Sequence, residues 1–133
     1  MSGRLYYLER ILAIISIVFL VQASYYKLIG HEESVYLFTF LEVEPYGRIT
    51  IGSLELLASI LLIIPRTALY GSIIGVSIMV GAIISHVFIT DLIIPNGPTL
   101  FILAVIVFLC CFFILFMRKE QLYLLFEGAF END

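Results

Sequence analysis

The stretch ITIGSLELLASILLII at residues 49–64 places a single charged side chain, Glu55, inside an otherwise uncharged and mostly apolar run. A charge at the centre of a membrane costs several kcal/mol unless a partner neutralises it. The small residues Gly52, Ala58 and Ser59 lie three or four positions from Glu55 and therefore share its side of a helix. Glu55 is thus expected to face other helices and not lipid.

The composition of the chain indicates that lipid surrounds most of it. Of the 133 residues, 62% are hydrophobic and only 14% are charged, whereas soluble domains are about half apolar and about a quarter charged. The net charge of −4 argues against a nucleic-acid partner, which would require a basic surface. The adjacent Cys110 and Cys111 give no disulfide framework and are interpreted as small hydrophobic side chains. We expect an all-α integral membrane protein.

Four apolar segments are long enough to cross a membrane, because about 20 helical residues span a hydrocarbon core of about 30 Å. We expect the spans at about residues 7–28, 46–64, 69–89 and 98–117 of a single domain, residues 1–133. Proline and glycine residues between the later spans predict tight turns, and hence an antiparallel four-helix transmembrane bundle. The fourth span offers few small residues apart from Ala104, so it is expected to pack at the periphery.

The basic residues predict how this bundle is oriented. Those on the side of both termini are Arg4, Arg10, Arg66, Arg118 and Lys119, against Lys27 and Arg48 on the other side. The positive-inside rule then places both termini in the cytoplasm, in a multi-pass protein of the inner cell membrane. The long connection at residues 29–48 is expected to lie on the outer membrane surface, because a bare loop of that length is uncommon. The segment LYLLF at residues 122–126 is expected to dock on the inner surface in the same way.

Three ionisable residues from three of the expected spans reach the same outer half of the bundle. Lys27 lies at the end of the first span, Glu55 lies about 9 Å below the start of the second, and His86 has a similar depth in the third. Each shares its helix side with small residues that permit close packing, namely Ser24, Gly52, Ser59, Gly75 and Ala82. We predict that Lys27, Glu55 and His86 form a ligand-binding or proton-relay site.

Other interpretations of these three side chains stay open. They could serve only to hold the helices in register. Taken singly, Lys27 could extend to the membrane surface, and His86 could be a core histidine beside a water-filled opening. A metal site formed by Glu55, His86 and Asp91 is less favourable, because one histidine and two carboxylates on two helices are a poor ligand set. We therefore expect no metal.

Three segments of the sequence resemble the DoxX-like family of small four-helix membrane proteins. They are YYKLIG at 25–30, IGSLELLASILLIIPR at 51–66 and MVGAIISHV at 79–87. The recurrent polar positions of that family match Lys27, Glu55 and His86, while Ser24 stands where the family usually has glycine, which leaves less room for a very close helix approach. The family takes its name from a subunit associated with thiosulfate:quinone oxidoreductase and a terminal oxidase, so the resemblance implies a redox-linked membrane protein.

Three functions are expected on this basis. The first is a membrane subunit that binds a quinone or other small molecule at Lys27, Glu55 and His86, and that assists an oxidoreductase instead of catalysing a reaction alone. The second is a non-enzymatic scaffold for the assembly of another membrane protein. The third is a small proton-coupled transporter, which four spans without an inverted repeat disfavour unless the chain forms a homo-oligomer. The expected partners are the lipid bilayer and another membrane protein or oxidoreductase subunit.

Overall fold

The computed structural model describes residues 3–85, 87 and 97–131, and within these residues it contains helices and short turns but no strand. The elements are α1 (Gly3–Ile29), α2 (Glu32–Phe40), α3 (Tyr46–Ile63), the 3₁₀ helix η1 (Pro65–Thr67), α4 (Ala68–Ser85), α5 (Gly97–Met117) and α6 (Lys119–Glu131). The prediction of an all-helical fold is thereby confirmed for the described part of the chain.

Three single segments are long and apolar enough to cross a membrane, namely α1, α3 and the segment Pro65–Ser85 that combines η1 with α4. Phe101–Met117 and Lys119–Gly128 meet the same criterion only together, as a pair bent by 69°, so they count as a fourth candidate only if the pair is one span. The described residues thus provide three or up to four candidate spans, and the chain is a multi-pass membrane protein in contact with the bilayer.

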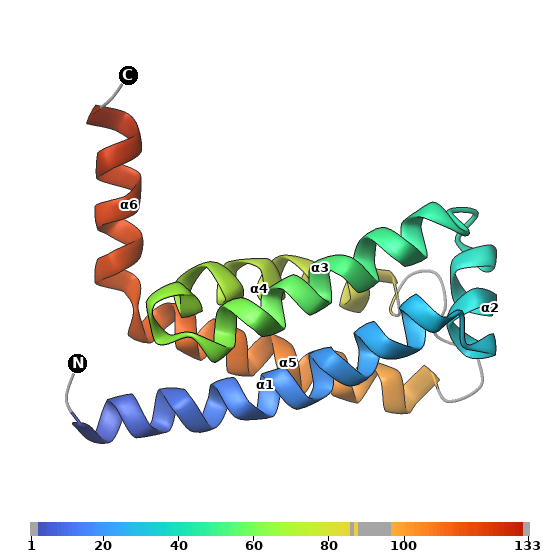
Figure 1. Ribbon diagram of the computed structural model, residues 1–133, viewed down its shortest axis with the longest axis horizontal. Helices are drawn as coiled ribbons and strands as arrows, with labels where there is room; N and C mark the ends of the chain where they lie inside the picture. Colours follow the sequence, from blue (N-terminus) through green and yellow to red (C-terminus); the bar gives the residue numbers. More distant parts are fainter. Residues whose placement is uncertain (1–2, 86, 88–96, 132–133) are drawn as a thin grey trace.

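The long helices α1, α3, α4 and α5 lie side by side, and α2 covers one end of the group (Figure 1). Each of α1 and α4 contacts both α3 and α5, so the four helices surround a common core. The buried side chains of this core are mostly small or branched: Ala13, Leu20, Ala58, Leu62, Ala68, Met79, Ala104, Val107, Cys111 and Ile114. These residues leave room for helices to approach closely, which is how helices associate in lipid.

The expectation that the fourth span packs at the periphery is wrong. α5 contributes Ala104, Val107, Cys111 and Ile114 to the core, and it packs along both α1 and α4. On α4, a Cβ atom built at Gly75 would lie only 2.6 Å from Sγ of Cys111. The small residue that this contact requires is therefore supplied by α4, since a close approach needs a small residue on only one of the two facing helices.

The connection at residues 29–48 contains α2 and is attached firmly to the helices on either side. α2 contacts α1 and α3, and its Phe38 is buried. At the start of α3, Nε of Arg48 donates to both carboxylate oxygens of Glu44, at 2.7 and 3.0 Å. Nη1 of Arg48 donates to the backbone carbonyl of Lys27. The same carbonyl also accepts a hydrogen bond from the backbone N–H of Gly30, at 3.3 Å. Arg48 therefore adds a second bond that holds the last turn of α1, where Lys27 lies.

Candidate functional site

The close contact between α1 and α3 positions two of the predicted site residues. Oγ of Ser24 donates to the backbone carbonyl of Gly52 at 2.8 Å, in a buried position. A Cβ atom built on Gly52 would lie 3.0 Å from Cβ of Lys27, so the missing side chain of Gly52 provides the space. The helices are close despite the serine at position 24, because its hydroxyl lies in the contact as a hydrogen-bond donor. Lys27, one turn after Ser24, is thereby held opposite α3.

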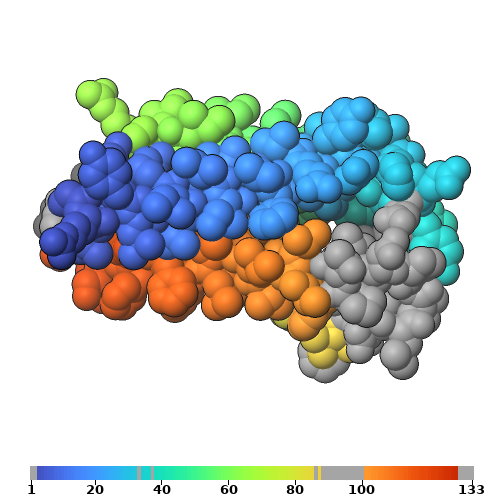
Figure 2. All heavy atoms as spheres, turned by 90° about the horizontal axis from the view of Figure 1, so that it is seen from below, coloured from blue at the N-terminus to red at the C-terminus, as the bar shows by residue number. Residues whose placement is uncertain are grey.

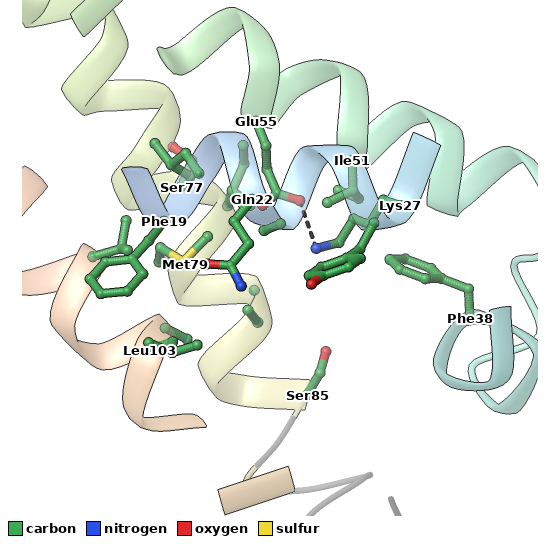
Figure 3. Close-up of a pocket in the computed structure, with 18 of the residues that line it drawn as sticks. Phe19, Gln22, Lys27, Phe38, Ile51, Glu55, Ser77, Met79, Ser85 and Leu103 are labelled. Atoms are coloured by element: carbon green, nitrogen blue, oxygen red, sulfur yellow. Dashed lines mark ion pairs between the residues drawn. The ribbon is translucent and has the colours of Figure 1, made fainter. Parts of the chain in front are cut away.

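Lys27 and Glu55 form an ion pair across this contact, with Nζ of Lys27 2.8 Å from Oε1 of Glu55 (Figure 3). The side chain of Glu55 is 1% exposed and that of Lys27 is 18% exposed. Neither carboxylate oxygen accepts a hydrogen bond of ordinary geometry from the described residues. An ionised carboxylate can accept about four hydrogen bonds. Lys27 therefore neutralises the charge of Glu55, while the carboxylate retains the capacity to accept hydrogen bonds from another molecule.

The ion pair lies in the wall of a cavity of about 560 Å³, lined by side chains from α1 to α5. Sites for small molecules typically have volumes of about 300–1,000 Å³ and mostly apolar walls with a few polar groups. Most of the residues that line this cavity are apolar, and the polar ones are Gln22, Tyr26, Lys27, Glu55, Ser77 and Ser85. Figure 3 shows Gln22 on the same side of the cavity as the ion pair, with Phe19, Met79 and Leu103 among its apolar walls.

The other residues predicted for the site are distributed differently. Ala82 lines the cavity, whereas Gly75 faces Cys111 and Oγ of Ser59 donates to the carbonyl of Glu55 within α3, at 2.8 Å. His86, the third predicted site residue, lies outside the described residues, as does Asp91. Within the described part of the chain, no group of three His, Cys, Asp or Glu side chains is placed to hold a metal ion.

A second buried cluster of charges lies near the other end of α1, and sequence reasoning missed it. Oε1 of the fully buried Glu9 is 2.6 Å from Nη2 of Arg10 and 3.0 Å from Nη2 of Arg118, which directly follows α5. Nη1 of Arg10 donates to the backbone carbonyls of Leu62 and Ile63 at 2.9 and 3.3 Å. These are carbonyls that the end of α3 leaves free. The cluster therefore joins the ends of α1, α3 and α5.

The two buried carboxylates differ in the hydrogen bonds that they make. Both oxygens of Glu9 accept hydrogen bonds from Arg10, and Oε1 also accepts one from Nε of Arg118. Nη1 of Arg118 donates to the side-chain oxygen of Gln121 at 3.1 Å. Because every nitrogen of the two guanidinium groups has a partner, we interpret the Glu9 cluster as structural. Glu55, with an ion pair and unused acceptor capacity beside a cavity, is the better candidate for a binding residue.

Comparison with known proteins identifies one family. The model of the DoxX-like family matches residues 11–114, which is most of the chain. The matched range runs from the third turn of α1 into the last turn of α5, so it contains the ion pair and the cavity but not Arg118 or α6. Comparisons with curated proteins and with solved structures found no match.

Proposed function

Because the chain belongs to the DoxX-like family, as its motifs predicted, we propose that it is a redox-linked membrane subunit that binds a quinone or hydroquinone beside Lys27 and Glu55. The observation that carries this proposal is the buried carboxylate of Glu55 in the wall of an apolar cavity, whose only polar side-chain partner among the described residues is the ammonium of Lys27, so that most of its acceptor capacity is unused. A buried acceptor of this kind is costly unless a donor reaches it. A ligand hydroxyl would be such a donor.

The residues of the cavity fit a quinone head group. Phe19, Phe38 and Leu103 provide apolar walls for a ring and a prenyl tail. When bound, a quinone accepts two electrons and two protons and becomes a hydroquinone. The ammonium of Lys27 and the amide of Gln22 can donate hydrogen bonds to ligand oxygens, and the carboxylate of Glu55 can accept a hydroxyl proton. A partner oxidoreductase subunit would supply or receive the electrons, and His86 stays the predicted third member of the site.

The proposed arrangement in the membrane has α1, α3, α4 and α5 crossing as an antiparallel four-helix bundle. The 21 residues of α5 are about 32 Å long at 1.5 Å per residue, which matches a hydrocarbon core of about 30 Å. The exposed Arg4, Arg66 and Lys119 would lie at the cytoplasmic face. Lys27, in the last turn of α1, would then place the cavity in the outer half of the inner membrane.

Ligand binding to the purified protein in lipid nanodiscs tests the function. We expect a short-chain benzohydroquinone to bind the parent protein, and Glu55→Gln to weaken that binding by about tenfold or more, since a hydrogen bond to a charged group is worth about 1.5–3 kcal/mol. The corresponding benzoquinone should be affected less, because its carbonyls offer no proton to Glu55. Isothermal titration calorimetry measures both affinities.

The matched control is Glu127→Gln, an exposed acid on α6 far from the cavity, which should bind like the parent. Absence of binding to the parent, or equal affinities of the parent and Glu55→Gln, would exclude the proposed site. A scaffold function would instead show itself as a copurifying membrane protein and as tolerance of His86→Gln. A transporter would produce solute flux into liposomes that contain the protein.

A further inference from the structure

α6 presents apolar side chains that the rest of the described chain leaves uncovered. Tyr123, Leu124, Leu125 and Phe126 are 66%, 67%, 40% and 52% exposed. Figure 1 shows α6 projecting sideways from the group of long helices, at the end where the chain begins. In water such a surface would be unfavourable, because burying one large apolar side chain contributes about 1.5–3 kcal/mol.

The two sides of α6 have different chemistry. Leu122, Leu125 and Phe126 are spaced three and four residues apart and share one side of the helix. Glu120 and Glu127 are seven residues apart and share another side. Helices that carry large apolar residues on one side and charges on the other commonly lie in the membrane interface, with the apolar side about 5–10 Å deep.

The angle of α6 is fixed by Arg118, whose side chain is only 8% exposed. Nη2 of Arg118 lies 3.0 Å from Oε1 of Glu9 on α1, and Nη1 donates to Gln121 on α6. The chain bends by 69° between Phe101–Met117 and Lys119–Gly128. If α5 crosses the membrane, α6 therefore lies closer to the membrane plane than to the membrane normal.

The surroundings of α6 indicate lipid as its partner. Phe113 and Phe116 are exposed on the second half of α5, so the apolar surface of α5 continues toward α6. The cations Lys119, Arg66 and Arg4 are exposed. They belong to the start of α6, the turn between α3 and α4, and the start of α1, which lie at the same end of the molecule (Figure 1). Basic residues next to a membrane attract anionic head groups by about 1 kcal/mol each. α6 itself is acidic, with Glu120, Glu127 and Glu131 against Lys119. Apolar contact therefore favours the lipid surface, and the cations favour anionic head groups only where α6 joins the other helices.

We propose that α6 lies along the surface of the membrane that the other helices cross. Leu122, Leu125 and Phe126 insert at the boundary between head groups and acyl chains, while Glu120 and Glu127 face water. Lys119 contacts anionic phospholipid head groups. α6 thereby fixes the depth of the helix bundle in the membrane, independently of any ligand in the cavity.

Single-tryptophan variants of the full-length chain test this proposal, because the protein contains no tryptophan. Phe126→Trp reports on the apolar side of α6, and Leu124→Trp is the matched control on the opposite side. The two side chains are similarly exposed in the protein, at 52% and 67%. If no membrane covered α6, the two tryptophans should therefore be quenched to a similar extent. In vesicles of phosphatidylcholine and phosphatidylglycerol, we expect brominated lipids to quench Phe126→Trp several-fold more strongly than Leu124→Trp. Aqueous acrylamide should show the reverse order.

Phe116→Trp, on the exposed surface of α5, supplies the value for full lipid contact, and circular dichroism checks that all variants are folded. Equal quenching of Phe126→Trp and Leu124→Trp by acrylamide would show that α6 is in water and would overturn the proposal. Protection of Phe126→Trp without quenching by brominated lipids would place a protein there instead. Protection that increases with the protein-to-lipid ratio would identify a second copy of the chain, and it would overturn the proposal equally.

Discussion

At the scale of single residues, the described part of the chain contains two buried carboxylates in different chemical environments. Glu9 is fully buried and is joined to Arg10 and Arg118, both of which use all their guanidinium nitrogens. Glu55 has one polar side-chain partner among the described residues, the ammonium of Lys27. Excess acceptor capacity in a buried position is typical of binding sites, because a structural role alone would favour a fully satisfied group.

The ion pair predicts an asymmetric effect of mutations on stability. Lys27→Met leaves the charge of Glu55 buried without its cation, and breaking a buried pair in this way costs about 3–5 kcal/mol. The double variant Lys27→Met/Glu55→Leu removes both charges and should be close to the parent in stability, since apolar replacements of whole pairs are often neutral. Thermal unfolding in detergent micelles, followed by circular dichroism, should give a lower Tm for the single variant than for the double variant.

Lys119→Met is the comparison for loss of an exposed lysine. It removes only the contact of the ammonium with the Phe116 ring, worth about 0.5–1 kcal/mol at an exposed site, so it should lower the Tm much less than Lys27→Met. Equal Tm values for Lys27→Met and the parent would show that Lys27 does not carry the neutralisation of Glu55. In that case a bound proton or another cation must neutralise Glu55, and Lys27 would no longer be part of the proposed site.

The sequence was sufficient to predict that Lys27 and Glu55 meet, because each is an isolated charge on a side of an apolar helix rich in small residues. It was not sufficient for Glu9. Glu9 is adjacent to Arg10 and so is not an isolated charge in an apolar run, and its second partner, Arg118, is 109 residues away in the chain. Gln22 was also missed. Burying an uncharged amide without a partner costs less free energy than burying a charge, so the sequence gives a weaker signal that Gln22 contacts another polar group.

At the scale of helices, the glycines of α4 have different functions according to what each one faces. A Cβ atom built on Gly71 would lie 2.9 Å from the backbone oxygen of Ala58 and the backbone nitrogen of Leu62. A Cβ atom on Gly81, which lines the cavity, would have nothing within 4 Å. Gly71 therefore permits the close contact of α3 and α4, whereas Gly81 keeps the cavity wide.

Alanine at these two positions should consequently change stability in opposite directions. Gly71→Ala must push backbone atoms of α3 away, and such overpacking typically costs about 1–3 kcal/mol. Gly81→Ala meets no neighbour and gains helix propensity, worth up to about 1 kcal/mol. Thermal unfolding of both variants in the same detergent gives the comparison. Two variants with the same Tm would show that α3 and α4 are not packed as closely at Gly71 as the structure has them.

The helices themselves were predictable from runs of apolar residues and from the turn residues that separate them. The central position of α5 was not, because the small residue that admits it, Gly75, lies on the facing helix. The sharp bend before α6 was not predictable either. It depends on Arg118, which is held at once by Glu9 and by Gln121, and a sequence pattern does not reveal contacts between distant helices.

At the scale of the whole molecule, the two charge clusters lie toward opposite ends of α1. The Glu9 cluster connects α1, α3, α5 and α6 near the N-terminal end of α1. Figure 2 shows α1 (blue) lying along α5 (orange). The Lys27–Glu55 pair and the cavity lie toward the end that α2 covers. In a bilayer this would put a rigid, fully satisfied cluster near one face and a ligand site near the other. The site would then be reached from the outer half of the membrane.

Whether the cavity lies nearer the outer or the cytoplasmic face depends on the direction in which the chain is inserted. Labelling of single cysteines measures that direction. The exposed Arg4, Arg66 and Lys119 favour a cytoplasmic location for their end. A membrane-impermeant maleimide should therefore label Glu32→Cys, on α2, in intact cells, and should label Glu120→Cys, on α6, only after lysis. The native Cys110 and Cys111 are buried, so the parent protein gives a low background. Labelling of Glu120→Cys in intact cells would invert the orientation, because α6 and both termini would then lie outside, and the cavity would face the cytoplasm.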